Sequence, residues 1–543
     1  MVFARRSTTL LAAIIASCAM VLSLTACTSD NKTVVDGQTT VTSNSAGGVA
    51  VFTPSDGITL SQQTPLNKWA KLVHDLTKAL VDAGFKKGDI DHTTSDSLDK
   101  QSRAIQDFVV DHLSNNTTDD SGIAIAPDNM TLLVAPVVEA DASTRQYGDY
   151  VSQNLSTNDA TDEGATSDGE SSEDDSSKDD SSNTESDSTA SDEQAQAVDR
   201  LVSSLKLAKE SGMHVVLLGN SIEGYKPDAF VKFSDAQTIG KLQAEKMVSK
   251  LKLDKASKDN PKYIEVLLPY TAMDEKGNAN DSTFAQEAFR GIWQVLGSYY
   301  QKGVVESPSG TLDGKSTEND WQAVAYDAAK EGSTAKVLDK RLAKTDGQST
   351  LTRIDGIITM NDYIASEVVK ELDDLGYTGS AADINPQITI SGIVGNITGK
   401  KDLSRDAVPD PIKSPENDNA NDSSSSDDDA DKDTSASDKD RDSQWPLVTG
   451  YGAYVSNIPS IVNGKQWMTG MEDRQTIATD IAQACAKLNK DEALNSMPSI
   501  RNSEVGGVKK IPTINEPLLA VSAGNLKSAL IDPGYISLAD AGL

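Results

Sequence analysis

The stretch at residues 354–363, Ile-Asp-Gly-Ile-Ile-Thr-Met-Asn-Asp-Tyr, constrains the fold more than any other. A run of apolar, mostly β-branched residues ends at Asn361 and Asp362, and an amphipathic helical pattern follows at once. In a parallel sheet this junction places both side chains at the carboxyl end of a strand, where open α/β sheets bind ligands. Either residue could instead cap the helix, since Asn and Asp are favourable N-caps. The local sequence leaves both roles open.

Strands and helices alternate along most of the chain. Continuous apolar runs of the kind buried in parallel sheets are separated by stretches with helical spacing of apolar residues. This alternation predicts an α/β fold with parallel sheets, a first strand at residues 57–60 and a helix from near Ser143. Right-handed connections place the strand ends at Asn220, Asn361 and Tyr451 at one edge of their sheets.

The negative charge of the chain is concentrated in two segments. The net charge is −32 and the isoelectric point is near 4.5, which argues against a nucleic-acid partner and against electrostatic docking to anionic lipid. Residues 156–194 carry about −13 and residues 413–443 about −7 of this charge, in Asp/Glu/Ser-rich sequence. Both segments lack the apolar side chains that fold a core, so we expect two disordered acidic inserts.

Metal, cofactor and nucleophile motifs are not evident in the sequence. The three cysteines stand apart, and the four histidines are scattered without ligand spacing. The acidic runs lack the spacing of an EF-hand, which argues against calcium. No Ser/His/Asp arrangement or positioned carboxylate pair is recognisable. We therefore expect no metal, no cofactor and no enzymatic activity.

The amino terminus predicts export and lipid anchoring. Residues 1–26 contain two arginines, an apolar run and small residues, which together are typical of a signal peptide and too short for a resident membrane span. Residues 24–27, Leu-Thr-Ala-Cys, resemble a bacterial lipobox, in which Cys27 is diacylated and becomes the new amino terminus. The alternative is an ordinary secretory signal that contains a cysteine. Residues 27–50 are expected to form a flexible tether, so that the protein works on the extracytoplasmic face of the cell membrane.

The order of motifs resembles that of type I periplasmic substrate-binding proteins, in particular the sugar-binding receptors of bacterial ABC importers of the xylose and multiple-sugar type. The motifs are individually short, but they follow the family's order and spacing. In chain order they are residues 60–69, 133–137 (Leu-Val-Ala-Pro-Val), 230–233, 234–244, 357–362 (Ile-Ile-Thr-Met-Asn-Asp), 448–452 (Val-Thr-Gly-Tyr-Gly) and 531–535 (Ile-Asp-Pro-Gly-Tyr).

This resemblance implies two Rossmann-like lobes joined by three crossover strands, with hinges near Phe233, Met471 and Gly506 and a ligand held in the cleft between the lobes. It also implies a monomer that delivers a sugar-like ligand to an ABC permease. The expected segments are lobe 1 at 51–233 and 471–505, lobe 2 at 234–470, and a third crossover with the C-terminal segment at 506–543.

The resemblance also implies a set of ligand-binding residues, because sugars need polar partners for their hydroxyls and aromatic faces to stack on. The set is Asn361, Asp362, Asp235, Asn220, Tyr451 and Trp69. For several of these residues a purely structural role, such as capping or core packing, remains an open alternative. Asn220 and Asp235 follow strands and could be helix or turn caps, and Trp69 shares a helical register with core positions.

Several charges that the family places in its cleft are replaced in this chain. Ser221 stands where the family has an arginine, Ala325 where it has a second arginine, and Gly452 where it has a carboxylate. Losing an arginine from a buried polar site leaves its partners unpaired, so the ligand is expected to differ from that of the relatives. The predicted function is a lipid-anchored sugar receptor. The alternative is a sensory or structural lipoprotein that keeps the fold without transport.

Overall fold

The computed structural model describes residues 34–35, 38–39, 46–56, 65–115, 125–138, 145–156, 185–271, 282–343, 351–382 and 445–543. Residues 1–44 and 45–543 form separate units, and in the first unit β1 (Val34–Val35) and β2 (Gln38–Thr39) pair antiparallel. The features below belong to the second unit. Cys27, the strand predicted at 57–60, the insert at 413–443 and most of the insert at 156–194 lie outside the described residues.

Lobe 1 is built on a seven-stranded sheet in which the first five strands along the chain are parallel and β17 runs antiparallel to β18. In spatial order the strands are β17 (Ile500–Val505), β18 (Val508–Ile514), β9 (Ala229–Val231), β7 (His214–Leu218), β5 (Met130–Val134), β3 (Gly48–Pro54) and β4 (Ile90–Ser95). The buried apolar strands β5 and β7 lie at the centre, as their continuous hydrophobic sequence predicts.

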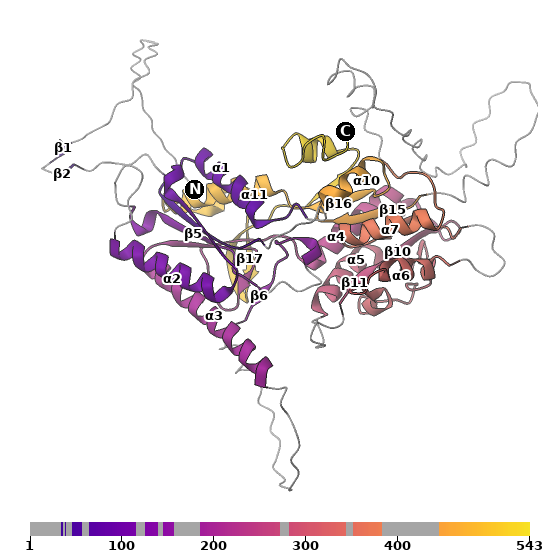
Figure 1. The fold of residues 1–543 in the computed structure, drawn as a ribbon, viewed down its shortest axis with the longest axis horizontal. Helices are drawn as coiled ribbons and strands as arrows, with labels where there is room; N and C mark the ends of the chain where they lie inside the picture. Colours follow the sequence, from indigo (N-terminus) through magenta and orange to yellow (C-terminus); the bar gives the residue numbers. More distant parts are fainter. Residues whose placement is uncertain are drawn as a thin grey trace, which may run out of the picture. The chain divides into compact units, whose positions relative to one another are not determined.

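Helices cover both faces of the lobe 1 sheet. On one face lie α1 (Trp69–Asp82) and α11 (Arg474–Leu488), and on the other lie α2 (Leu98–Asn115) and α3 (Glu185–Glu210), which run side by side (Figure 1). Successive strand residues serve opposite faces. Leu133 joins the core under α1 and α11, while Leu132 joins the core under α2 and α3.

Lobe 2 repeats this plan with a six-stranded sheet. In spatial order its strands are β12 (Val305–Glu306), β10 (Lys262–Val266), β14 (Gly356–Ile358), β15 (Leu447–Tyr451), β16 (Met468–Met471) and the antiparallel β19 (Leu519–Ser522). One face packs against α4 (Ala236–Leu251) and α5 (Thr283–Gln301), the other against α6 (Ser333–Arg341) and α7 (Asp362–Asp374). In each lobe the first five strands of the sheet along the chain are parallel and have the order 2-1-3-4-5. This is a doubly wound order, and such sheets bind ligands in a crevice at the carboxyl ends of their strands.

Shorter elements complete the unit. β6 (Asn154–Leu155) pairs with β8 (Ser221–Ile222), and β11 (Leu268–Tyr270) pairs with β13 (Ala325–Asp327), both in parallel. Helix α10 (Ile458–Val462) and a π-helical turn (Lys527–Ile531) contribute to a further apolar cluster, which the last hundred residues form together with Leu66. The short 3₁₀ helix η3 (Arg145–Tyr147) precedes β6.

The chain passes between the lobes three times, which confirms the predicted fold class. The first passage, at residues 232–235, links β9 to α4, and the second, at residues 472–473, links β16 to α11. The third passage is at residues 515–518, between β18 and β19. The prediction that placed the third passage near Gly506 was wrong. Gly506 and Gly507 have positive φ values of 54° and 77°, so they form the tight turn of the β17–β18 hairpin inside lobe 1.

Two further expectations differ from the structure. Strand β3 begins at Gly48, inside the segment predicted to be a tether, because Val49 and Val51 pack into the core. The α-helix predicted from near Ser143 is not present over the described residues 145–156, which hold the short 3₁₀ helix at Arg145–Tyr147 and the strand β6. Helix α3 begins at Glu185, within the predicted acidic insert.

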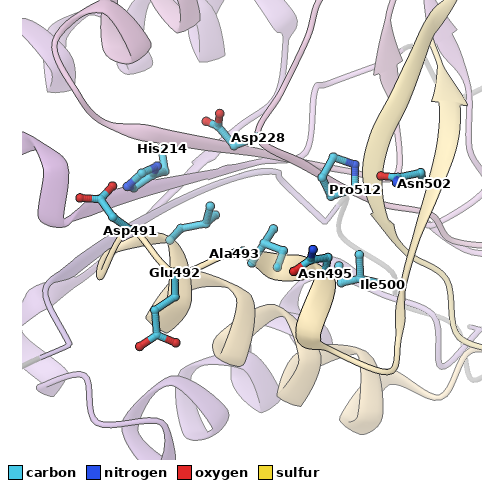
Figure 2. Close-up of a pocket in the computed structure, with 11 residues that line it drawn as sticks. His214, Asp228, Asp491, Glu492, Ala493, Asn495, Ile500, Asn502 and Pro512 are labelled. Carbon is cyan, nitrogen blue, oxygen red and sulfur yellow. The ribbon is translucent and has the colours of Figure 1, made fainter. Parts of the chain in front are cut away.

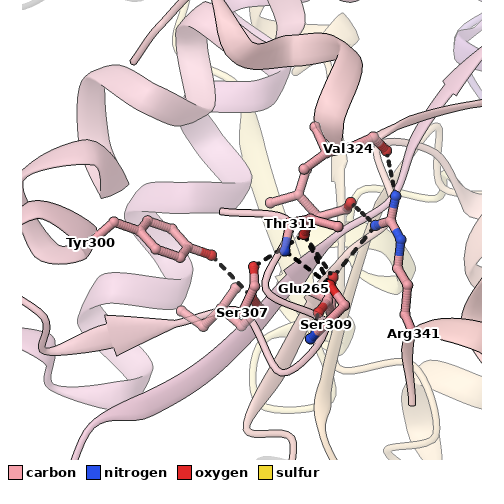
Figure 3. A network of polar contacts seen from close by, with 9 residues as sticks. Glu265, Tyr300, Ser307, Ser309, Thr311, Val324 and Arg341 are labelled. Carbon is pink, nitrogen blue, oxygen red and sulfur yellow. Dashed lines mark hydrogen bonds and ion pairs between the residues drawn. The ribbon is translucent and has the colours of Figure 1, made fainter. Parts of the chain in front are cut away.

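A buried charge network fastens the outer loops of lobe 2 (Figure 3). Glu265 is fully buried in β10 and accepts hydrogen bonds from the Ser309 amide at 2.8 Å and from Arg341 at 3.4 Å. Arg341 also donates to the carbonyls of Val266 and Val324. Burial raises the pKa of Glu265. Because these hydrogen-bond partners of Glu265 and Arg341 all lie within lobe 2, we assign the network a structural role.

Candidate functional site

The junction after β14 gives Asn361 two partners at once. Its Oδ1 accepts the Ile364 amide at 2.9 Å, so the residue is the N-cap of α7. Its Nδ2 donates to Oε1 of Gln146 at 3.0 Å. Gln146 belongs to the part of the chain that forms lobe 1. The preceding Met360 holds a positive φ of 68° while fully buried, a conformation that costs energy for a residue with a side chain. Asn361 therefore caps the helix and faces the other lobe.

Asp362 is engaged inside lobe 2. Its side chain is 0% exposed and accepts hydrogen bonds from the Tyr454 amide at 2.9 Å, Gln466 Nε2 at 2.7 Å and Thr469 Oγ1 at 2.9 Å. Burial raises the pKa of Asp362 to about 6, although these donors favour the charged form. The three partners lie in the loop after β15 and in or beside β16. This gives Asp362 a structural role; its ligand role stays a prediction.

Tyr451 is the last residue of β15, and its hydroxyl contacts lobe 1 and two of the passages between the lobes. Its hydroxyl lies 2.6 Å from Ser234 Oγ in the first passage, accepts from Asn67 Nδ2 at 3.1 Å and donates to Glu472 at 3.5 Å in the second passage. Glu472 also accepts the Ser234 amide at 2.6 Å. Burial raises the pKa of Glu472 to about 7 and holds the pKa of Tyr451 well above its ordinary value. Two hinge passages are thus tied together at this hydroxyl.

Residues 145–153, which we call the bridging segment, reach from lobe 1 to these side chains. Besides the bond to Asn361, the backbone carbonyl of Gln146 accepts the Tyr454 hydroxyl at 2.7 Å. The Tyr147 ring is buried in the lobe 2 core, 4.8 Å from the Phe284 ring and 6.3 Å from the Tyr451 ring between centroids. Gln146 therefore forms hydrogen bonds with polar side chains of lobe 2, and the next residue, Tyr147, packs against aromatic rings of lobe 2.

The rest of the bridging segment is held by lobe 1. Asp149 accepts from Lys68 Nζ at 2.8 Å and from the Trp69 amide, at the start of α1, at 3.1 Å. The Tyr150 hydroxyl donates to the Lys68 carbonyl at 2.5 Å. Gly148 makes the turn between the two halves, with φ of +99°, and a Cβ there would lie 2.7 Å from Asn67. Only glycine fits this position without strain.

The remaining predicted residues are buried or paired in lobe 1 and the first hinge passage. Trp69 packs edge-on against Tyr150 and Phe233 in the lobe 1 core. Asn220 accepts the Gln153 amide at 2.9 Å and donates to the Pro136 carbonyl at 2.9 Å. Asp235 caps α4 through the Thr238 amide and pairs with Lys232. Their ligand roles stay predictions beside these structural ones.

The three positions that depart from the family's pattern carry other contacts. Ser221 donates to Asn154, alongside the β6–β8 pairing, and Ala325 opens β13. The Gly452 carbonyl accepts the Leu66 amide at 2.9 Å, which joins the segment just before α1 to the end of β15. Gly452 has φ of +114°. A backbone contact thus stands where the family places a carboxylate.

Sequence reasoning missed the residues that complete this place, which are Gln146, Tyr147, Asn67, Ser234, Tyr454 and Glu472. One signal was available. Two tyrosines flank a Gly-Asp pair at residues 147–150, in a stretch that is otherwise polar and precedes the acidic insert. Aromatic residues in such a stretch indicate burial against another element.

A surface pocket of about 520 Å³ lies at the other end of the lobe 1 strands, beside His214, the first residue of β7 (Figure 2). Asp228, Asp491 and Glu492 add carboxylates to its lining. Asp228 and Glu492 already form ion pairs with Lys209 and Lys487. None of the residues predicted to bind ligand lines this pocket, which therefore carries no functional assignment.

The described residues hold neither a candidate metal site nor a candidate membrane-spanning helix. Groups of three or more His, Cys, Asp or Glu side chains suited to a metal ion were not found among them. Among the helices that the structure describes, none is both long and apolar enough to cross a membrane.

Comparison with known proteins gives structural likenesses only. No family model and no curated protein matches the sequence. A glucose-bound ABC transporter solute-binding protein from Clostridium phytofermentans is 17% identical, with 91% of this chain and 99% of that chain covered and a TM-score of 0.44. A carbohydrate transporter solute-binding protein from Chloroflexus aurantiacus, in complex with D-glucose, is 17% identical, with 92% and 98% covered and a TM-score of 0.42.

An arabinose-binding protein from Geobacillus stearothermophilus is 10% identical, with 89% of this chain and 99% of that chain covered and a TM-score of 0.41. Likenesses of this strength carry no argument about this chain. The strand order of the two sheets and the three passages between the lobes define the fold.

Proposed function

We propose that this chain is a lipid-anchored, extracytoplasmic solute-binding protein that takes a sugar-like ligand between its lobes and delivers it to an ABC permease. The observation that carries the proposal is the meeting of polar groups from both lobes at the carboxyl ends of β14 and β15. Asn361 and Tyr451 come from lobe 2, and Asn67 and Gln146 come from lobe 1. Doubly wound sheets bind ligands at this edge.

The chemistry of the meeting place suits a neutral, hydroxyl-rich ligand. Amide and hydroxyl groups of Asn361, Asn67, Tyr451 and Tyr454 offer both donors and acceptors, and the tyrosine rings offer apolar faces. The nearby cation Lys68 is already paired with Asp149. A phosphate or carboxylate ligand would need positive charge, so a sugar or polyol fits better.

Anchoring and delivery follow from the amino terminus and the two-lobed fold. Diacylation of Cys27 would hold the protein at the membrane and leave the lobes free to meet a permease as a monomer. Labelling cells with a clickable palmitate analogue tests the anchor: the wild-type chain should carry the label, and the Cys27→Ser variant should not. Equal labelling of both forms would contradict lipidation at Cys27.

A thermal-shift screen of the full chain against monosaccharides and polyols tests ligand binding. Saturation by a compound at about 100 times its Kd adds about 2.7 kcal/mol to the free energy of unfolding. The matched variant is Asn361→Ser, because serine also caps helices but lacks the amide donor. We expect one compound to raise the wild-type melting temperature and to lose this effect in Asn361→Ser. No response to any compound would contradict the carbohydrate assignment.

A second function is favoured by one observation, which is that the predicted ligand side chains are already bonded within the chain. The residues in question are Asn361, Asp362, Asn220, Asp235 and Tyr451. A lipoprotein that keeps the fold without transport would look like this. The two functions differ in their response to solutes, since the second predicts no stabilisation by any member of the panel.

A further inference from the structure

We propose that Gln146 and Tyr147 are a built-in occupant of the interlobe site, so that a solute must displace them to bind; this rests on the proposed function. The two residues supply what a bound sugar would supply. Gln146 gives an acceptor to Asn361 and a second acceptor to Tyr454, and Tyr147 gives a flat ring beside Phe284 and Tyr451.

The occupant is fastened to one lobe and inserted in the other. Asp149 and Tyr150 bind Lys68 and the first amide of α1 on lobe 1, three to four residues from the side chain that reaches Asn361 on lobe 2. The segment therefore crosslinks the lobes as a solute does in a closed binding protein. The closed arrangement is then stable without solute.

The insertion is imperfect at one atom, which makes displacement feasible. The Tyr147 hydroxyl is buried close to the Asn361 side chain, but it makes no well-formed hydrogen bond with any residue that the structure describes. A buried hydroxyl without a partner is unfavourable relative to the same hydroxyl in water. A ligand that satisfied Asn361 would release this group to solvent.

Hydrogen exchange of the full chain, without added solute, tests the occupancy. The Leu66 amide reports the contact between the lobes, since it donates to the Gly452 carbonyl, while the amide of Leu133 in β5 reports lobe 1 alone. Removing the interlobe bond with Gln146→Ala should speed exchange at Leu66 by about fivefold and leave Leu133 unchanged. Tyr147→Ala should speed it by a larger factor.

The matched control is Gln153→Ala in the same segment. Gln153 contacts Asn220 and Ser221 through its backbone, so truncating its side chain should leave exchange at Leu66 as in the wild type. Equal Leu66 exchange in the wild type, Gln146→Ala and Tyr147→Ala would overturn the occupant. If Tyr147→Ala fails to fold, the Leu66 exchange rate in Gln146→Ala, compared with the wild type, decides whether the occupant is present.

The sugar panel applied to Gln146→Ala separates this inference from the proposed function. A larger stabilisation by the same compound than in the wild type supports both. Faster Leu66 exchange with no response to any compound supports the occupant and counts against the sugar receptor. A sugar response equal in wild type and variant, with unchanged Leu66 exchange, supports the receptor and overturns the occupant.

Discussion

Replacing Asp362 by alanine should destabilise lobe 2 rather than act on a ligand alone. The change removes the acceptor of three buried donors. The Tyr454 amide loses the partner it has in the structure, whereas Gln466 keeps the Met468 carbonyl at 3.1 Å and Thr469 keeps the Gly470 carbonyl at 3.4 Å. An unsatisfied buried donor costs about 1–3 kcal/mol, so the expected loss in the free energy of unfolding is about 1–3 kcal/mol.

Urea unfolding of Asp362→Ala, followed by tryptophan fluorescence, measures this loss. The matched control is Asp373→Ala in the same helix, where the carboxylate is exposed and pairs with Lys465 at 2.8 Å. A surface pair of this kind contributes about 0–1 kcal/mol, so the control should unfold almost as the wild type does. Wild-type stability in Asp362→Ala, together with a lost sugar response, would refute the structural role and restore the ligand role.

The pH dependence gives an independent check on Asp362. Its folded pKa of about 6 lies above the ordinary value of 3.8, so the folded state holds an extra proton between these values. The contribution of Asp362 to the free energy of unfolding is therefore fully present below the ordinary pKa and is lost as pH rises to about 6, by up to about 1.4 kcal/mol per pH unit. The Asp362→Asn variant should lack this part of the slope. An unchanged slope would contradict the raised pKa.

Three further predictions concern the hinge and the bridging segment. The raised pKa of Glu472 lets the folded state bind a proton between pH 4.5 and about 7, so the free energy of unfolding should fall with pH over this range. Glu472→Gln should remove this part of the fall, which urea midpoints measured across the range will show. An unaltered slope counts against it. Gly148→Ala should destabilise the chain by about 1–3 kcal/mol in urea, since φ of +99° and the approach of Asn67 leave no room for a Cβ, and a neutral result would contradict this. Tyr147→Phe should keep or raise the melting temperature; a clear drop would show that the hydroxyl is well bonded.

The sequence predicted the architecture because the signal was local. Apolar runs and helical periodicity marked the central strands and the junction at Asn361, and their alternation required parallel sheets. The error in the third passage was also local in origin. Gly506 and Gly507 signal a turn, and a turn between paired strands is indistinguishable in sequence from a turn between lobes.

The site was less predictable because its contacts are remote in sequence. Asn67 meets Tyr451 across 384 positions, and Asn361 meets Gln146 across 215. The bridging segment has neither helical nor strand periodicity, so its sequence did not predict which residues its side chains contact. The cap-or-ligand question at Asn361 had no single answer, because one end of the amide caps α7 and the other crosses to lobe 1.

The most direct test of the account is the dissociation constant of the best sugar from the panel, measured by calorimetry on wild type and Gln146→Ala. If the solute competes with the built-in occupant, removing one of its interlobe bonds should tighten binding about fivefold. Asn361→Ser should weaken or abolish binding in either background. Equal affinity in wild type and Gln146→Ala would contradict competition, and no heat from any sugar would contradict the receptor itself.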